Sequence, residues 1–259
     1  MNAADGQCPI LLINLASSVA RLEEASRSLA AEGLAFERIE AVDGRLLDAT
    51  QRAALAPDNR GWFYQPLTPG EIGCFMSHLV ALRAIVARGW QVAAVFEDDF
   101  SVRPGLAACL RELASEPAAL PDVVKVFGAR GRGERIRGLR CGGAIVRSTS
   151  PPSCTTAAVW TRRGAERFLG TFGAIRRPID VQLKHWWEHG LDVAWVDPPP
   201  VGESSRHTPA STIGGRRTPG AMARLGRLRY RTAYAMAREA RYAGVHGVGA
   251  WLRSLRSPG

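Results

Sequence analysis

The sequence has little lysine, no paired cysteines and no long uninterrupted apolar run. Five cysteines are scattered without a C-x-x-C pair, and none lies at a metal-like spacing from a histidine, so we interpret them as reduced thiols. Arg83 and Arg88 interrupt the most apolar region, which leaves it short of the roughly 18 apolar residues that cross a membrane. No basic segment precedes Arg21, which argues against a secretory signal and predicts a cytoplasmic location.

Composition excludes three further classes of protein. Hydrophobic residues make up 46% of the 259 residues and charged residues 22%, which is typical of a globular protein and not of a disordered one. Glycine and proline show no collagen-like period. A chain of this length needs no disulfide framework to hold a core, and it predicts one large domain or one domain with an appendage.

Positive charge is concentrated at the C-terminal end. Residues 216–259 contain ten arginines and one acid, whereas residues 1–215 carry a net charge of only +1. We therefore divide the chain into a main domain, 1–215, and a basic tail, 216–259, predicted to be helical or partly disordered. The nearly neutral main domain does not indicate a nucleic-acid binder. A basic amphipathic tail suits an anionic membrane surface, and the alternative is a solvated tail.

Apolar runs alternate with amphipathic segments along the main domain. This alternation predicts an α/β fold in which a mostly parallel central sheet carries helices on both faces. Residues 45–67 predict an irregular loop or lid, and the Gly- and Arg-rich stretch 128–150 predicts a flexible loop. The expected strands are 10–15, 36–42, 91–96, 123–127, 154–160 and 192–196, and helices are expected from 19, from 68, at 161–169 and at 179–189.

Three consecutive carboxylates, Glu97, Asp98 and Asp99, follow the predicted strand 91–96. Ligands of open α/β sheets bind beyond the carboxyl ends of the strands. If the backbone stays extended, Glu97 and Asp99 project to one side and Asp98 to the other. Two carboxylates on one side suit a hard divalent cation, and the alternative is a solvated acidic turn.

The predicted helix after Thr68 has a complete start signal. Thr68 as the N-cap, Pro69 at N1 and Glu71 at N3 form a capping box. Gly73 in the first turns costs roughly 1 kcal/mol relative to alanine, which indicates the close approach of a ligand or of another backbone segment. His78, further along, is either a hydrogen-bonded structural residue or a ligand.

A second pair of histidines lies on the predicted helix 179–189. His185 and His189 are spaced i, i+4 and would share one face, as a metal pair or as part of an ordinary amphipathic helix. Asp180 stands at the start of this helix, where an acidic residue is favourable with the helix dipole.

In this order, the motifs resemble glycosyltransferase family 25, the lipooligosaccharide-type galactosyltransferases and their collagen-modifying relatives. The resemblance covers roughly residues 9–213, and this chain departs from the family pattern at Met76, Trp160 and Glu203. The residues that carry it are Ile13-Asn14-Leu15, Arg21, Ala41-Val42-Asp43-Gly44, Leu67-Thr68-Pro69-Gly70-Glu71-Ile72-Gly73-Cys74, Ser77-His78, Glu97-Asp98-Asp99, 155–165, Pro178-Ile179-Asp180 and Ser211-Thr212-Ile213.

The resemblance implies a GT-A-like fold and an inverting hexosyltransferase. Its substrates would be a UDP-sugar, with galactose the commonest sugar in the family, and a saccharide or lipid-linked glycan of LPS, LOS or another surface polymer. The acidic triplet would bind Mn²⁺ or Mg²⁺, with Asp99 the principal ligand and Glu97 assisting. Asp180 is the first candidate for the catalytic base and Glu71 the second. The donor-binding candidates are Asn14, Arg21, Asp43, Ser77, His78, Glu97 and Asp98.

Two other classes of function remain open. One is a metal-dependent hydrolase that uses Glu97, Asp99 and the pair His185 and His189. The other is a catalytically silent scaffold that binds a membrane or a polyanion through its tail. Only the transferase uses all the motifs of the main domain together. It is therefore our main prediction, in the cytoplasm and peripherally on the inner face of the membrane.

Overall fold

The computed structural model describes residues 7–57, 62–128, 132–203 and 221–255. The predicted motif Ser211-Thr212-Ile213 lies outside these residues. The described strands are β1 (Ile10–Asn14), β2 (Glu37–Glu40), β3 (Val92–Glu97), β4 (Phe100–Val102), β5 (Val123–Lys125), β6 (Glu134–Gly138), β7 (Ala144–Arg147), β8 (Ala157–Thr161), β9 (Val193–Asp197) and β10 (Val201–Glu203). The α-helices are α1 (Val19–Ala30), α2 (Ala49–Leu55), α3 (Pro69–Ala87), α4 (Leu106–Ser115), α5 (Arg162–Thr171), α6 (Ile179–Lys184) and α7 (Ala221–Ser254).

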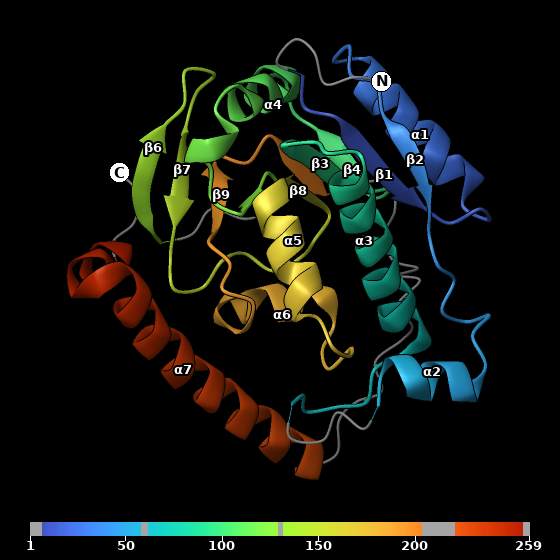
Figure 1. Ribbon diagram of the computed structural model, residues 1–259, viewed down its shortest axis with the longest axis vertical. Coiled ribbons are helices and arrows are strands. Elements are labelled where there is room, and N and C mark those ends of the chain that lie inside the picture. Colours follow the sequence, from blue (N-terminus) through green and yellow to red (C-terminus); the bar gives the residue numbers. More distant parts are fainter. Residues whose placement is uncertain (1–6, 58–61, 129–131, 204–220, 256–259) are drawn as a thin grey trace.

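A sheet of eight strands, in the order β2-β1-β3-β8-β5-β9-β7-β6, forms the centre of the described structure (Figure 1). β1 pairs in parallel with β2 and β3, and β5 pairs in parallel with β9. β8 and β7 are antiparallel to both of their neighbours. Six of these eight strands therefore run in one direction, so the predicted mostly parallel sheet is confirmed, with two reversed strands inserted in it. β4 and β10 form a separate antiparallel pair.

Helices pack on both faces of this sheet, as predicted. The alternation of side chains along β1 separates two cores: Ile10 and Leu12 belong to a cluster with α1 and α4, and Leu11 and Ile13 to a cluster with α3, α5 and α6. Every residue of β1 is buried, which explains its continuous apolar sequence.

Two segments that were predicted to be loops contain regular structure. α2 lies within 45–67 and begins at a capping box between Asp48 and Gln51. The stretch 128–150 contains the hairpin of β6 and β7, which turns through Gly142 and Gly143 at φ values of 107° and 79°. Both predictions were wrong. A helix of only seven residues is too short to show a clear apolar period in the sequence, so α2 was missed. The glycines of the second segment form the turn of a hairpin and not a flexible loop.

The N-terminal end of α3 packs directly against the backbone of residues 42–44. A Cβ on Gly73 would lie 2.4 Å from the carbonyl oxygen of Val42, and one on Gly44 would lie 1.7 Å from that of Pro69. Ser77 Oγ accepts a hydrogen bond from the Val42 N–H at 2.8 Å and donates one to the Gly73 carbonyl at 2.7 Å. The close approach predicted at Gly73 is thus made by another backbone segment.

Judged by length and composition alone, α3 could cross a membrane. This corrects the expectation that no segment is apolar over a long enough stretch to do so. Of its most apolar window, 56% is buried inside the fold, between the sheet and α5. Since the core helix of a soluble protein meets the same criterion, this is weak evidence of a membrane span.

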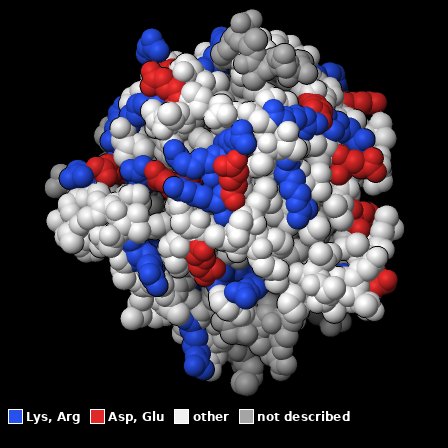
Figure 2. Space-filling view, viewed as in Figure 1, with Lys and Arg blue, Asp and Glu red and all other residues white. Residues whose placement is uncertain are grey.

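α7 lies within the predicted tail and contacts the main domain along its length (Figure 1). Tyr230 Oη lies 3.4 Å from Nε2 of His185, Thr149 donates a hydrogen bond to Glu239 at 3.1 Å, and Arg253 pairs with Glu134. Figure 2 shows basic and acidic side chains intermixed on this face of the molecule, so the net charge of +10 does not make it uniformly basic.

Candidate active site

The carboxyl ends of β1 and β3 lie side by side and bring polar residues together. Ile13 of β1 is in register with Glu97 of β3. Asn14 is buried, and its Nδ2 donates a hydrogen bond of 2.6 Å to Oδ2 of Asp98. Arg38 Nε donates to Oδ1 of Asn14 at 3.1 Å, which fixes the orientation of the amide. Arg38, whose role the sequence did not indicate, therefore positions Asn14 toward Asp98.

Arg21 of α1 bridges two of the three carboxylates. Its NH2 group lies 2.5 Å from Oδ1 of Asp98 and 3.1 Å from Oδ2 of Asp99. The expected alternation, with Asp98 on the opposite side from Asp99, is wrong. The reason is that β3 ends at Glu97 and the backbone bends at 98–99 before β4 begins.

Burial and mutual repulsion act on the acids of this bend. Burial raises the pKa of Asp98, although Arg21 opposes the shift. Burial and the neighbouring Glu97 carboxylate raise the pKa of Asp99 to about 6. Oδ1 of Asp99 is buried and has no hydrogen-bond partner among the described residues. An acid of this kind is a poor anion on its own and gains from a cation that neutralises it.

Glu97 belongs to a second group of contacts, made with α3 and β8. Its Oε1 atom lies 3.0 Å from Nε2 of His78 and accepts a hydrogen bond of 2.6 Å from Thr155 Oγ1. Burial raises the pKa of Glu97, but these two hydrogen bonds and the His78 charge outweigh burial and leave it below its usual value. Because Glu97 is held as an anion, it complements a positive group at this edge of the sheet.

Cys74 joins this second group, which sequence reasoning missed. Ligand atoms of Cys74, His78 and Glu97 all lie within 4.8 Å of one another. Cys74 and His78 are one helical turn apart on α3, and this i, i+4 spacing could have been seen in the sequence. The prediction that no cysteine lies at a metal-like spacing from a histidine was therefore wrong. Burial, with Glu97 next in importance, raises the pKa of the Cys74 thiol well above its usual value.

Three of the predicted residues make contacts within the fold instead of within this cluster. Asp43 accepts two hydrogen bonds from the Arg45 guanidinium, which lower its pKa. Ser77 joins α3 to Val42, as described above. Glu71 is buried, and its Oε2 accepts hydrogen bonds from the N–H and the hydroxyl of Thr68, so the predicted capping box is present.

Asp180 lies in the first turn of α6, half-buried and close to both lysines of the chain. Burial lowers the pKa of Lys125 to about 8 and also lowers that of Lys184, and in each case Asp180 opposes the shift. The carboxylate of Asp180 also adds to the rise in pKa that burial causes at Cys74. Asp180 is thus within electrostatic reach of the group formed by Cys74, His78 and Glu97.

His185 and His189 do not form a pair on one helix, so that prediction was wrong. α6 ends at Lys184, and a 3-10 turn over Trp186–Glu188 follows it. Nδ1 of His185 lies 3.0 Å from the Val181 carbonyl, whereas His189 contacts Thr171 and Gln182. Burial lowers the pKa of both histidines. Each is a separately bonded structural residue, and the described metal-like cluster contains neither.

Comparison with known proteins agrees with the motifs of the N-terminal half. Residues 7–127 match the family model "Glycosyltransferase family 25 (LPS biosynthesis protein)". This stretch is therefore similar to family 25. It contains every residue predicted for the transferase site except Asp180.

The curated proteins that match part of this chain include some named galactosyltransferases and some named inactive. Procollagen galactosyltransferase 1 of Danio rerio is 40% identical over 95 residues, which are 35% of this chain and 16% of that protein. Procollagen galactosyltransferase 2 of Homo sapiens is 36% identical over 95 residues, 35% of this chain and 15% of the relative. Inactive glycosyltransferase 25 family member 3 of Homo sapiens is 31% identical over 115 residues, 42% of this chain and 19% of the relative. The chain therefore aligns with less than a fifth of the length of these relatives.

Proposed function

We propose that this chain is an inverting, GT-A-like hexosyltransferase, which moves a sugar from a UDP-sugar to a saccharide acceptor of LPS, LOS or another surface glycan. Galactose is the proposed sugar, since the relatives above are named galactosyltransferases. The observation that carries the proposal is the joining of Asn14, Arg21 and the acidic triplet at the ends of two adjacent parallel strands. This is the position where α/β sheets bind ligands.

The acidic triplet fits a divalent cation. Carboxylate oxygens are the ligands that Mn²⁺ and Mg²⁺ prefer, and Oδ1 of Asp99 is a buried oxygen without a partner among the described residues. Asp99 and Glu97 would hold the ion, which would supply positive charge to the departing diphosphate. Arg21 adds a fixed positive charge beside the same carboxylates. Cys74 and His78 would favour Zn²⁺ instead, and comparing the two metals separates the alternatives.

Asp180 is the proposed catalytic base, which removes the proton from the acceptor hydroxyl. Glu71 is less suited to this role, because its carboxylate is buried and bonded to Thr68 at the start of α3. Asp180 is half-buried and lies next to Lys184, which lines a cavity. A carboxylate at the edge of a cavity can reach a bound hydroxyl, as a general base must.

Calorimetric titration of UDP into the purified protein tests this function. With Mn²⁺ present we expect binding that EDTA removes and that Asp99→Asn abolishes, since that variant loses the charge that holds the ion. Asp48→Asn is the matched control, because asparagine caps a helix as well as aspartate and α2 should be unaffected. If neither EDTA nor Asp99→Asn changes the affinity for UDP, the metal site is rejected. An absence of UDP binding under all conditions would reject the donor class, and would favour the inactive relatives as the better guide.

α7 supports the proposed location on the inner face of the membrane. Leu225, Leu228 and Met236 are 54%, 63% and 70% exposed, on the side of the helix opposite to Tyr230 and Tyr234, which contact His185. An exposed apolar stripe among arginines suits an anionic bilayer, where each arginine adds about 1 kcal/mol.

Flotation with vesicles of mixed neutral and anionic lipid tests this docking. We expect the full chain to bind anionic vesicles and to be released by high salt. Replacing Leu225, Leu228 and Met236 together by serine should weaken binding about tenfold or more, because the buried apolar area is lost. The same substitution at Leu46, which is 83% exposed outside α7, is the control. Equal binding by both variants would contradict the proposal.

A further inference from the structure

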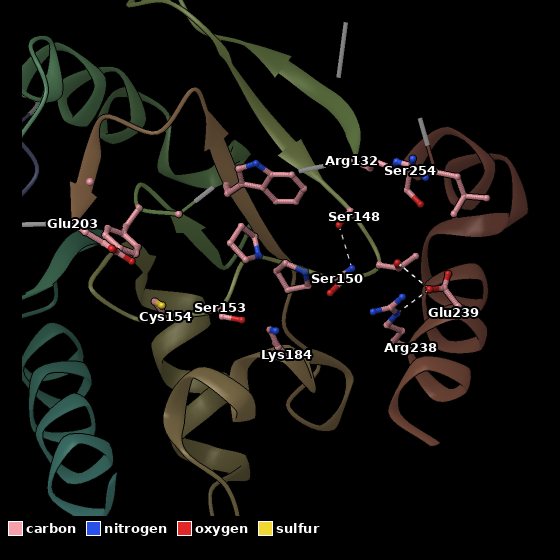
Figure 3. A pocket seen from close by; sticks show the side chains of 18 of the residues that line it. Arg132, Ser148, Ser150, Ser153, Cys154, Lys184, Glu203, Arg238, Glu239 and Ser254 are labelled. Atoms are coloured by element: carbon pink, nitrogen blue, oxygen red, sulfur yellow. Dashed lines mark hydrogen bonds and ion pairs between the residues drawn. The ribbon is translucent and has the colours of Figure 1, made fainter. Parts of the chain in front are cut away.

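A cavity of about 930 Å³ lies between the loop of residues 148–154, β10 and α7 (Figure 3). Its volume is within the range of pockets that bind small molecules, which is about 300–1,000 Å³. Hydroxyl groups of Ser148, Ser150 and Ser153 line it together with charged side chains. The proposed function, on which the following inference rests, does not yet give this cavity a role.

Positive charge exceeds negative charge around the cavity. Four cations line it, Arg103, Arg132, Lys184 and Arg238, against two carboxylates, Glu203 and Glu239.

The carboxylates do not neutralise these cations. Glu239 is already engaged, since it pairs with Arg238 and accepts hydrogen bonds from Thr149 and Trp251. Among the described residues, no carboxylate forms an ion pair with Arg103, Arg132 or Lys184. Asp180 acts on Lys184 without a direct ion pair. Three cations at one cavity without a bonded carboxylate favour an anionic ligand.

The cavity adjoins the candidate active site through two short connections. Cys154 lines the cavity, and the next residue, Thr155, donates a hydrogen bond to Glu97. Lys184 lines the cavity, and Asp180 precedes it by one turn of α6. Asp180 therefore lies between the acidic cluster and the cavity, and a saccharide in the cavity can present a hydroxyl to it.

The position of the cavity favours the acceptor over the diphosphate of the donor. Neither Asn14 nor Arg21 nor any residue of the acidic triplet lines it. Its walls come from residues after 100, including α7, whereas the proposed donor site is formed by the ends of β1 and β3.

We propose that this cavity binds an anionic group, a phosphate or a carboxylate, on the acceptor saccharide. Arg103, Arg132 and Lys184 hold the anion, and the serine hydroxyls bind the sugar that carries it. The acceptor of this transferase is accordingly an acidic glycan and not a neutral one.

Direct binding of small saccharides tests the proposal without turnover. Glucose 6-phosphate and glucuronate are titrated into the full chain at low ionic strength, and glucose and inorganic phosphate are titrated in parallel. We expect one acidic sugar to bind more tightly than both glucose and inorganic phosphate, and the stronger of the two identifies the anion. Arg132→Gln and Lys184→Gln should each weaken that binding about tenfold, since each removes a charge-assisted contact. Arg111→Gln, an exposed arginine of α4 outside the cavity, should leave it unchanged.

The outcomes separate this proposal from the proposed function. Glucose that binds as well as the acidic sugars, or unchanged binding in both cavity variants, overturns the anionic acceptor. Inorganic phosphate that binds as tightly as the acidic sugars overturns it as well, because the sugar is then not recognised. Competition between UDP and the acidic sugar would assign the cavity to the donor. If UDP fails to bind while the acidic sugar binds as expected, the transferase is rejected and the anion site stands.

Discussion

The acidic cluster at the end of β3 and the cavity beside α7 differ in how their charges are partnered. At the cluster, Asp98 is bonded to Asn14 and Arg21, and Glu97 is bonded to His78 and Thr155. At the cavity, Arg103, Arg132 and Lys184 form no ion pair among the described residues, and Asp180 acts on Lys184 without direct contact. Three adjacent carboxylates repel one another, so the fold must supply contacts that hold them. Unpartnered cations around a cavity instead leave positive charge for a ligand.

The largest expected effect comes from the residue that lies between these two regions. Asp180→Asn should lower kcat by about 10²–10⁴, the usual contribution of a general base, while UDP binding persists. Glu71→Gln is the comparison, because it should act mainly on stability through the start of α3. The measurement is kcat by release of UDP, together with UDP affinity by calorimetry. Near-normal turnover in Asp180→Asn would show that this residue is not the base.

A smaller effect is expected on stability, from substitutions of one glycine in α3 and one in α7. Gly73→Ala should destabilise the fold by about 3 kcal/mol, the upper end of the usual cost of overpacking, because its Cβ would meet the Val42 carbonyl oxygen at 2.4 Å. Gly226→Ala in α7 should stabilise the helix by up to about 1 kcal/mol, because the new Cβ would meet no described atom within 4 Å outside the backbone of its own helix. Urea denaturation followed by circular dichroism measures both. Similar stabilities for the two variants would contradict the tight contact between α3 and residues 42–44.

The smallest effect is a pH dependence of stability that arises from Lys125. Burial lowers its pKa to about 8 from 10.5, so between these values the unfolded chain binds more protons than the folded one, and stability rises with pH. The rise should be roughly 1–2 kcal/mol between pH 8 and 9.5. Below pH 8 the cost of the buried charge is fully present in the folded state. Lys125→Met should remove the rise in denaturation curves, and parallel curves for the two proteins would reject this account.

Local signals in the sequence predicted much of the fold. Thr68 and Glu71 located the start of α3, and the continuous apolar sequence of residues 10–14 located a central strand. The structure also contains α4, β4 and β10, which were not predicted, and the reversed strand β8, whose direction depends on pairing with β3 and β5. Strand direction is a long-range property, which residue spacing does not encode.

The candidate site was only partly predictable for the same reason. Glu97, Asp98 and Asp99 stood out because they follow an apolar strand, and Arg21 and Asn14 followed from the resemblance. Arg38 reaches the site from β2, and nothing in its local sequence marks it. Thr155 reaches the site from just before β8; it lay in the segment 155–165 that carries the resemblance, but without a predicted role. The cavity could not be predicted at all, because its walls join residues between 103 and 255 that only the folded chain brings together.

The scarcity of lysine has a chemical consequence for the cavity beside α7. Lys125 and Lys184 are the two side-chain amines of the whole chain, and both lie beside Asp180. Lys125 is fully buried, whereas Lys184 lines the cavity. Burial lowers the pKa of Lys184, with Asp180 opposing the shift, and Lys184 is the side-chain amine that a reagent in the cavity can reach. Apart from the chain's own N-terminus, an acylating reagent therefore reacts with this protein chiefly inside the cavity, and mass spectrometry of the modified Lys184 peptide would report whether that cavity is filled.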